Sequence, residues 1–440
     1  MEQTFMKEKP ILPLVLTMSL PMVLSMLVSS LYNIVDSYFV AQIDENAMLA
    51  LSLVYPIQIL ITAVGVGFGI GINAVTAFFL GAQNTDSADK AVSQGIILSG
   101  IHGILMTLLC LWGMPQFLHI FTSDSTVIEY SLRYSNIIFM FSTTTTISVA
   151  FEKIFQSVGK MNVSMFSMIS GCVINIVLDP LMIFGVGFFP RLEIQGAAIA
   201  TGIAQISTLA IYLIYFLKIK LPVHFTMNHK IWSEPVYKRI YAIGIPATLN
   251  MALSSLLITA LNGILSGFSQ SYVLILGIYY KLQTFIYLTA NGIVQGIRPL
   301  IGYNYGAGRQ DRVRAIHRIA LILGTMVMAF GTMLCLFIPG QIMGIFTTQP
   351  DTIIAGSTAL RIICCGFILS TISVMASGTF EGLGKGIPSL IVSIIRYIVI
   401  IPIALIFSQI FGAVGVWHAF WFTELLAAIL SAIMLHRYLK

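Results

Sequence analysis

Charged residues are scarce in this chain: Asp, Glu, Lys and Arg make up 9% of its 440 residues, whereas 57% are hydrophobic. So little charge cannot cover the surface of a water-soluble globule of this length. No GxxxxGK[ST] phosphate-binding loop occurs, so we expect no ATP hydrolysis by the chain and no ATPase subunit is implied. The five cysteines all fall in apolar stretches without metal or disulfide spacing, so we expect them to be packing residues.

Long apolar runs dominate what the chain does contain. About 20 apolar residues span the roughly 30 Å hydrocarbon layer as a helix. Twelve such spans are predicted, which indicates an all-α polytopic membrane protein. They lie at about 11–40, 48–80, 90–113, 127–150, 160–186, 194–217, 238–268, 272–303, 313–337, 352–377, 386–409 and 413–436.

The two halves of the chain repeat each other at a constant offset. Pro21 matches Pro246, Gly67 matches Gly292 and Gly71 matches Gly296 (246 − 21 = 225). Six spans in each half give both copies the same orientation, so the repeat is parallel. The predicted domains are an N-terminal lobe (1–217), a cytoplasmic linker (218–237) and a C-terminal lobe (238–440). Two lobes that move about a central cavity are typical of a transporter.

Basic residues predict the orientation. Lysines and arginines outside the spans gather on the side of the N-terminus, whereas the opposite loops hold only Arg191. By the positive-inside rule both termini face the cytoplasm, and we expect the chain in the cell membrane with an uncleaved first span. The net charge of +6 therefore marks loops that face lipid head groups. No basic patch interleaved with exposed aromatics suggests a nucleic-acid partner.

Five oxygen-bearing side chains are predicted at one depth in the N-terminal lobe. Asp36 lies about five residues, or roughly 8 Å, below the outer end of the first span, and Tyr32 lies one turn deeper. Asp179 lies about seven residues below the outer end of the fifth span, with Asn175 one turn deeper, and Thr201 lies six residues into the sixth.

Two carboxylates in a poorly solvated pocket cannot both ionise cheaply. We therefore expect Asp36 and Asp179 to share a proton, or to hold Na⁺ together with Asn175 and Thr201, because hard cations prefer oxygen ligands. Tyr32 lies beside this cation or proton site. The alternative is that the two aspartates are separately hydrogen-bonded helix residues. Pro21, inside the first span, indicates a hinge or a static kink.

The second lobe does not repeat these acids, since Asp36 maps on Leu261. Its mid-span charges are Arg396 and Glu424, which predict either a structural ion pair or a second coupling or substrate site. Lys281 either lines a cavity or snorkels, and we expect Arg298 to snorkel from a helix end.

Aromatic and methionine side chains are candidates for a substrate cavity. Rings meet cationic charge, and flexible thioethers adapt to varied shapes. The alternative for each of these residues is ordinary packing or contact with lipid. The candidates are Tyr279, Tyr280, Tyr287, Met161 and Met165.

On these residues the chain resembles the multidrug and toxic compound extrusion (MATE) family over nearly its whole length. The resemblance rests on the two six-span lobes, on Pro21, Tyr32 and Asp36, on Asn175, Asp179 and Thr201, and on the glycine-rich second and eighth spans. It implies a V-shaped antiporter that exports amphiphilic, mostly cationic compounds in exchange for H⁺ or Na⁺, with no cofactor. The acidic cluster looks like the N-lobe cation site of one branch of the family.

We therefore predict a cation-coupled efflux antiporter that works by alternating access and is not an enzyme. A flippase for a lipid-linked oligosaccharide is the first alternative, and it predicts a cavity rich in Lys and Arg. An intramembrane aspartyl hydrolase is the second, but the context Leu178-Asp179-Pro180 lacks the GxGD motif of such enzymes.

Overall fold

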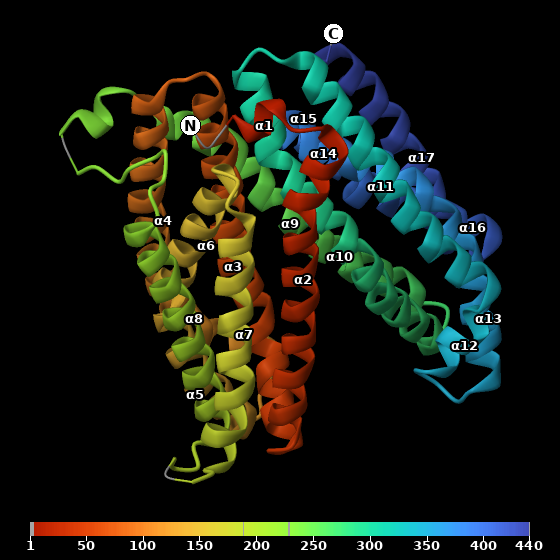
Figure 1. Ribbon diagram of the computed structural model, residues 1–440. Coiled ribbons are helices and arrows are strands. Elements are labelled where there is room, and N and C mark those ends of the chain that lie inside the picture. The colour runs from red at the N-terminus through yellow and green to blue at the C-terminus, as the bar shows by residue number, and fades with distance from the viewer. Residues whose placement is uncertain (1–3, 188, 228, 440) are drawn as a thin grey trace. The chain divides into compact units, whose positions relative to one another are not determined.

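The computed structural model describes residues 4–187, 189–227 and 229–439, apart from the side chains of residues 229 and 230. Within these ranges every regular element is a helix (Figure 1). Eleven helices there are long and apolar enough to cross a membrane, and a pair bent by 45°, Ser125–Met140 and Ser142–Ser157, makes up to twelve. That bent pair is the span predicted at 127–150, so the all-α polytopic fold is confirmed.

The elements follow one another along the chain as short and long helices. The first half contains α1 (Phe5–Glu8), α2 (Ile11–Ala41), α3 (Glu45–Gly81), α4 (Thr85–Phe121), α5 (Ser125–Met140), α6 (Ser142–Ser157), α7 (Met161–Phe184) and α8 (Glu193–Lys218). The second half contains η1 (His229–Ser233), α9 (Val236–Ser266), α10 (Gln270–Gly306), α11 (Gln310–Phe337), α12 (Pro339–Gly344), α13 (Pro350–Ile363), η2 (Cys364–Gly366), α14 (Phe367–Gly382), α15 (Gly386–Ile394), η3 (Ile395–Val399), α16 (Ile400–Phe411) and α17 (Ala413–Tyr438).

The helices pack into two compact units that differ from the predicted lobes. Unit 1 contains residues 1–23 and 245–440, and unit 2 contains residues 24–244. The helix α2 therefore passes from unit 1 to unit 2 shortly after Pro21, and α9 passes from unit 2 to unit 1 just before Pro246. A proline removes a helical hydrogen bond, so each crossing occurs at a weak point of its helix.

Glycines let the crossing helices approach closely inside each unit. In unit 1, a Cβ on Gly292 of α10 would lie 2.7 Å from the Cα of Val23 in α2. In unit 2, a Cβ on Gly71 of α3 would collide with the carbonyl oxygen of Ile240 in α9. Small residues at such contacts are how membrane helices pack tightly. The start of each repeat thus packs on the second long helix of the other repeat.

Backbone carbonyls of the N-terminal segment bind side chains of α10 and α11 within unit 1. The Met6 side chain is buried, and its carbonyl accepts a hydrogen bond from Nδ2 of Asn304 at 3.1 Å. Nη2 of Arg312 donates to the carbonyl of Lys9 at 2.7 Å. These contacts hold the N-terminal segment on α10 and α11.

The segment that joins the repeats is fastened to the start of α4. Nε2 of the fully buried Gln94 donates to the carbonyls of Ile231 at 2.6 Å and Glu234 at 2.9 Å, and its Oε1 accepts from the Tyr237 amide at 2.6 Å. Lys90 Nζ lies 3.6 Å from Glu234 Oε2. One glutamine therefore satisfies three backbone groups of the connection.

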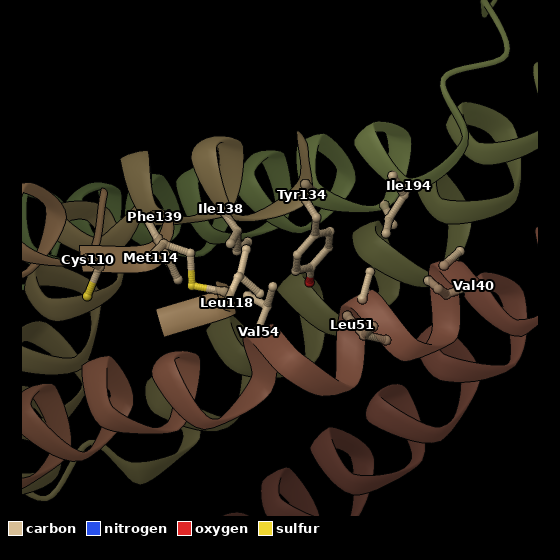
Figure 2. Close-up of a cluster of buried hydrophobic side chains, with 14 of the residues drawn as sticks. Val40, Leu51, Val54, Cys110, Met114, Leu118, Tyr134, Ile138, Phe139 and Ile194 are labelled. Carbon is tan, nitrogen blue, oxygen red and sulfur yellow. The ribbon is translucent and has the colours of Figure 1, made fainter. Parts of the chain in front are cut away.

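A buried apolar cluster joins α2, α3, α4, α5 and α8 in unit 2 (Figure 2). Leu51 and Val54 of α3 meet Leu118 of α4 and Ile138 of α5 there. The ring of Tyr134 lies in the same cluster, with its hydroxyl directed toward α3. This cluster holds together the helices that surround the acidic side chains described next.

Candidate functional site

The five oxygen-bearing side chains predicted from depth all lie in unit 2, on three helices. Asn175 and Asp179 of α7 and Thr201 of α8 are buried, whereas Tyr32 and Asp36 of α2 are partly buried. Nδ2 of Asn175 donates to Oδ1 of Asp179 at 3.3 Å and to Oγ1 of Thr201 at 3.2 Å. The Tyr32 hydroxyl lies within hydrogen-bonding reach of Thr201. The amide of Asn175 is thus the centre that joins α7 to α8.

The structure brings the two carboxyl groups together. Asp36 and Asp179 lie within hydrogen-bonding reach of each other, one from α2 and one from α7. Oδ1 of Asp36, Oδ2 of Asp179 and Oδ1 of Asn175 are buried, and among the described residues none of these oxygens has a hydrogen-bond partner. Two carboxyl groups in contact need a shared proton or a cation between them. The unpartnered oxygens can accept the hydrogen bond of a shared proton or act as ligands to a cation.

Proline shapes α7 at this point. Pro180 follows Asp179 inside the helix. Because proline has no N–H, the carbonyl of Ile176 loses its helical partner one turn earlier. A further acceptor is therefore left close to the aspartate.

Two residues that the sequence did not single out complete the surroundings of the acids. Tyr134 of α5 lies close enough to act electrostatically on Asp36 and Asp179. Its hydroxyl accepts a hydrogen bond from Nε2 of Gln58 in α3 at 3.2 Å. Tyrosine and glutamine inside apolar spans usually serve packing, so only the fold distinguishes these two from the rest.

A cavity of about 250 Å³ opens beside the cluster and is lined by Tyr32, Asn175 and Thr201. Glu152 and Gln205 line it as well, and sequence reasoning missed both. Oε1 of Glu152 pairs with Nζ of the neighbouring Lys153 at 2.7 Å, and Lys153 is 3% exposed. Within the described residues no group of three or more His, Cys, Asp or Glu could hold a metal ion. Two carboxyl groups with amide and hydroxyl oxygens suit a proton or a singly charged cation.

Four candidates for the substrate cavity line a separate cavity, of about 280 Å³, in unit 1. Tyr280, Tyr287, Arg396 and Glu424 all contribute to its wall. The guanidinium of Arg396 contacts the Glu424 carboxylate through Nε at 3.0 Å and Nη2 at 2.9 Å. The predicted ion pair is therefore formed, and it faces a cavity.

The other four candidates lie elsewhere. Tyr279 is buried, stacked near Phe367 with ring centroids 6.4 Å apart. Lys281 is exposed, and its Nζ lies 5.5 Å from the centre of the Phe346 ring. Met161 is buried and Met165 partly buried on α7, and neither is among the residues that line the two cavities above.

One expectation about a charge was wrong. Arg298 does not snorkel from a helix end: it is 5% exposed and forms hydrogen bonds with Oε2 of Glu381 through Nε at 3.1 Å and Nη2 at 2.7 Å. The guanidinium turns inward because a buried carboxylate on α14 is within reach. Glu381 sits near a predicted cytoplasmic loop, so its burial was not visible in the sequence.

Known proteins are similar to this chain over nearly its full length. Multidrug export protein MepA of Staphylococcus haemolyticus is 26% identical over 437 residues, which cover 99% of this chain and 96% of that protein. MepA of Staphylococcus aureus is 27% identical over 439 residues, with the same coverage. A solved structure described as the outward-facing conformation of a multidrug resistance MATE family transporter matches with a TM-score of 0.92 and 22% identity, covering 100% of this chain and 98% of that one.

The MatE family model matches the chain twice, over residues 21–181 and 246–406. The two matches begin at equivalent positions of the internal repeat, since Pro21 pairs with Pro246. Together they cover well over half of the chain. This chain therefore belongs to the MatE family of membrane transporters.

Proposed function

We propose that the protein is a cation-coupled antiporter that exports amphiphilic, mostly cationic compounds from the cytoplasm by alternating access. The relatives named for multidrug export support the substrate class. The observation that carries the coupling is the contact between the carboxyl groups of Asp36 and Asp179, with unpartnered oxygens around them. The coupling ion is H⁺ or Na⁺, the chain sits in the plasma membrane, and both termini face the cytoplasm.

The proposed cycle depends on the charge of the acidic cluster. A proton or Na⁺ that enters from outside neutralises the pair formed by Asp36 and Asp179. Loss of repulsion between the carboxylates then favours a conformation in which α2 bends at Pro21, next to the point where the helix changes units. That conformation binds the exported compound more weakly, and release of the ion to the cytoplasm resets the protein. Only this difference in affinity between the two states drives export.

The flippase alternative finds no support in the two cavities described. A lipid pyrophosphate needs several Lys or Arg side chains around it. The cavity in unit 2 has no lysine or arginine among its lining residues, and the cavity in unit 1 has only Arg396, which Glu424 neutralises.

Proteoliposomes test the coupling directly. Purified protein is reconstituted, ethidium is the cargo, and a pH gradient and a sodium gradient are imposed separately. We expect one of the two gradients to drive ethidium transport by the wild type. We expect Asp36→Asn and Asp179→Asn to reduce transport to the level of empty liposomes, because one carboxyl group no longer competes for the ion.

Asp351→Asn is the matched control, since Asp351 is an exposed carboxylate at the start of α13. It should transport like the wild type. Each variant is first checked for a single peak in size-exclusion chromatography. Wild-type rates in a correctly folded Asp36→Asn protein would remove the coupling role of the pair.

A further inference from the structure

The cavity in unit 1 is the internal duplicate of the cavity beside the acidic cluster. The two family-model matches, 21–181 and 246–406, extend the offset of 225 into α7, which places Gly171 on Arg396 (396 − 171 = 225). For the last long helix of each repeat, α8 and α17, glycine contacts show which residues are equivalent. A Cβ on Gly196 would collide with the carbonyl of Met182, and a Cβ on Gly415 would collide with the carbonyl of Phe407. Because 407 − 182 is again 225, α8 matches α17 at an offset of 219 (415 − 196).

With this register the cation-binding oxygens of unit 2 are absent from the duplicate. Carbon side chains replace the hydroxyl, amide and carboxyl groups at five matched positions. The pairs are Tyr32 and Leu257, Asp36 and Leu261, Asn175 and Ile400, Asp179 and Ala404, and Thr201 and Phe420. The duplicate cavity therefore lacks the oxygen atoms that we propose to bind H⁺ or Na⁺ in unit 2.

Charge appears in the duplicate at two other matched positions. Arg396 takes the place of Gly171, and Glu424 takes the place of Gln205 (424 − 205 = 219). Their side chains are 9% and 16% exposed, and Ser373 Oγ also donates to Oε2 of Glu424 at 3.1 Å. The cavity thus carries one fixed positive and one fixed negative charge side by side, inside the membrane-spanning region.

An ion pair in this position needs a reason other than stability. Apolar residues of similar volume often replace a buried ion pair without loss of stability. Arg396 also lies on η3, a single π-helical turn, a geometry that is frequent at functional sites. An ionisable pair within a membrane span therefore indicates a ligand site.

Unused polar groups and aromatic rings surround the pair. The contacts of Arg396 with Glu424 are made by Nε and Nη2, and Nη1 takes no part in them. The buried hydroxyl of Tyr280 has no hydrogen-bond partner among the described residues. The rings of Tyr287, Tyr397 and Phe420 complete the wall, with the amides of Gln283 and Asn291.

We propose that this cavity binds aromatic zwitterions, compounds that carry a carboxylate and a cationic nitrogen on a ring system. The ligand carboxylate binds the free edge of the Arg396 guanidinium and the Tyr280 hydroxyl. Its cationic nitrogen faces the carboxylate of Glu424, and its rings stack on the tyrosines. The proposal rests on the proposed export function for its biological meaning, because the ligand would be an exported compound. Binding itself requires no ion gradient.

A matched pair of dyes tests this without transport. Rhodamine 110 has a free carboxylate and rhodamine 123 is its methyl ester, so the two differ in the negative charge and in one methyl group. Fluorescence polarisation with the full-length protein in detergent gives both dissociation constants. We expect the wild type to bind rhodamine 110 at least about tenfold more tightly, which is the size of one hydrogen bond to a charged group.

Variants of the protein test which residues bind the carboxylate of rhodamine 110. The double variant Arg396→Gln, Glu424→Gln should bind the two dyes about equally, because neither the carboxylate nor the cationic nitrogen then meets an opposite charge. Tyr280→Phe, which removes only the unpartnered hydroxyl, should lower the preference a few-fold. The control is Glu129→Gln with Arg133→Gln, an ion pair at the outer end of α5 in unit 2, and it should leave the preference unchanged.

Two results would overturn the proposal: no preference in the wild type, or an undiminished preference in the double variant. If the double variant does not fold, Arg396→Lys keeps the charge but not the planar fork, and an unchanged preference there also counts against the site. The dye measurement and the ethidium transport assay test different proposals, so a negative result in one does not imply a negative result in the other. Dye preference without transport rejects only the proposed coupling, and transport without dye preference rejects only this site.

Discussion

The buried charges of Arg298 and Glu381 are paired with each other and hydrogen-bonded. Arg298 donates twice to Glu381, and Ser389 Oγ donates to the other carboxylate oxygen at 3.1 Å. Both charged side chains are less than one tenth exposed. Such a fully connected group joins α10, α14 and α15, and its stability depends on all its members.

Removal of one member should be more harmful than removal of both charges. We expect Glu381→Ala to lower the free energy of unfolding by roughly 3–5 kcal/mol, because it leaves a buried guanidinium unpaired. The double variant Arg298→Met, Glu381→Leu should recover most of that loss. Denaturant unfolding in detergent measures both. A loss of under about 1 kcal/mol for Glu381→Ala would contradict a buried pair.

At the residue scale, depth along the helices predicted most of the acidic cluster. Counting residues from helix ends placed Asp36, Asp179 and Thr201 at one level, and the structure brings them together. The same counting failed for Arg298, because distance from a helix end does not show whether a carboxylate lies inside. Tyr134 and Gln58 could not be identified, since which faces of α3 and α5 turn toward the acidic side chains is a property of packing.

At the scale of elements, long helices approach each other closely where one of them has a glycine. Gly71 of α3 touches the backbone of α9. Gly113 of α4, by contrast, has no atom within 4 Å of the place where a Cβ would stand. Both are helical glycines in unit 2. Comparing the same substitution at the two positions therefore distinguishes the effect of close packing from that of helix propensity.

We therefore expect opposite effects of one substitution. Gly113→Ala should be neutral or stabilising by up to about 1 kcal/mol, because alanine favours a helix over glycine. Gly71→Ala should be destabilising, since the carbonyl of Ile240 cannot move away without shifting α9. Thermal unfolding of the two variants side by side checks this. Equal midpoints would show that α3 and α9 do not touch at Gly71.

Apolar length predicted the helices well, and their irregular parts poorly. The span at 127–150 is broken between α5 and α6, and a π-helical turn interrupts the span at 386–409. Neither break has a proline or glycine at its centre. The distortions arise from tertiary packing, which no local pattern in the sequence records.

At the scale of the whole molecule, duplication was followed by divergence. The repeat preserves the lengths of some helices, since α3 and α10 are both 37 residues long. It does not preserve chemistry: one copy has the acidic cluster, and the other has Arg396 with Glu424. The repeat was visible in the sequence, but the exchange of segments 1–23 and 236–244 between units was not. Contacts between positions so distant along the chain produce no local pattern in the sequence.

Labelling of cysteines in whole cells tests the orientation. In a chain whose five cysteines are replaced by serine, we expect Arg191→Cys to react with a membrane-impermeant maleimide in intact cells. Lys220→Cys should react only after the cells are permeabilised. Both positions are exposed, so a difference reports the side of the membrane rather than burial. The reverse pattern would invert the assigned orientation.

The contacts of segment 1–23 also set an order for biogenesis. Met6, Ser19 and Val23 pack on parts of α10, which a ribosome makes only after all of segment 24–244. That intervening segment can assemble while synthesis continues, but segment 1–23 must wait in the bilayer without its partners. Chaperones or insertases that protect this segment should therefore matter more for yield than those that act on α16 and α17.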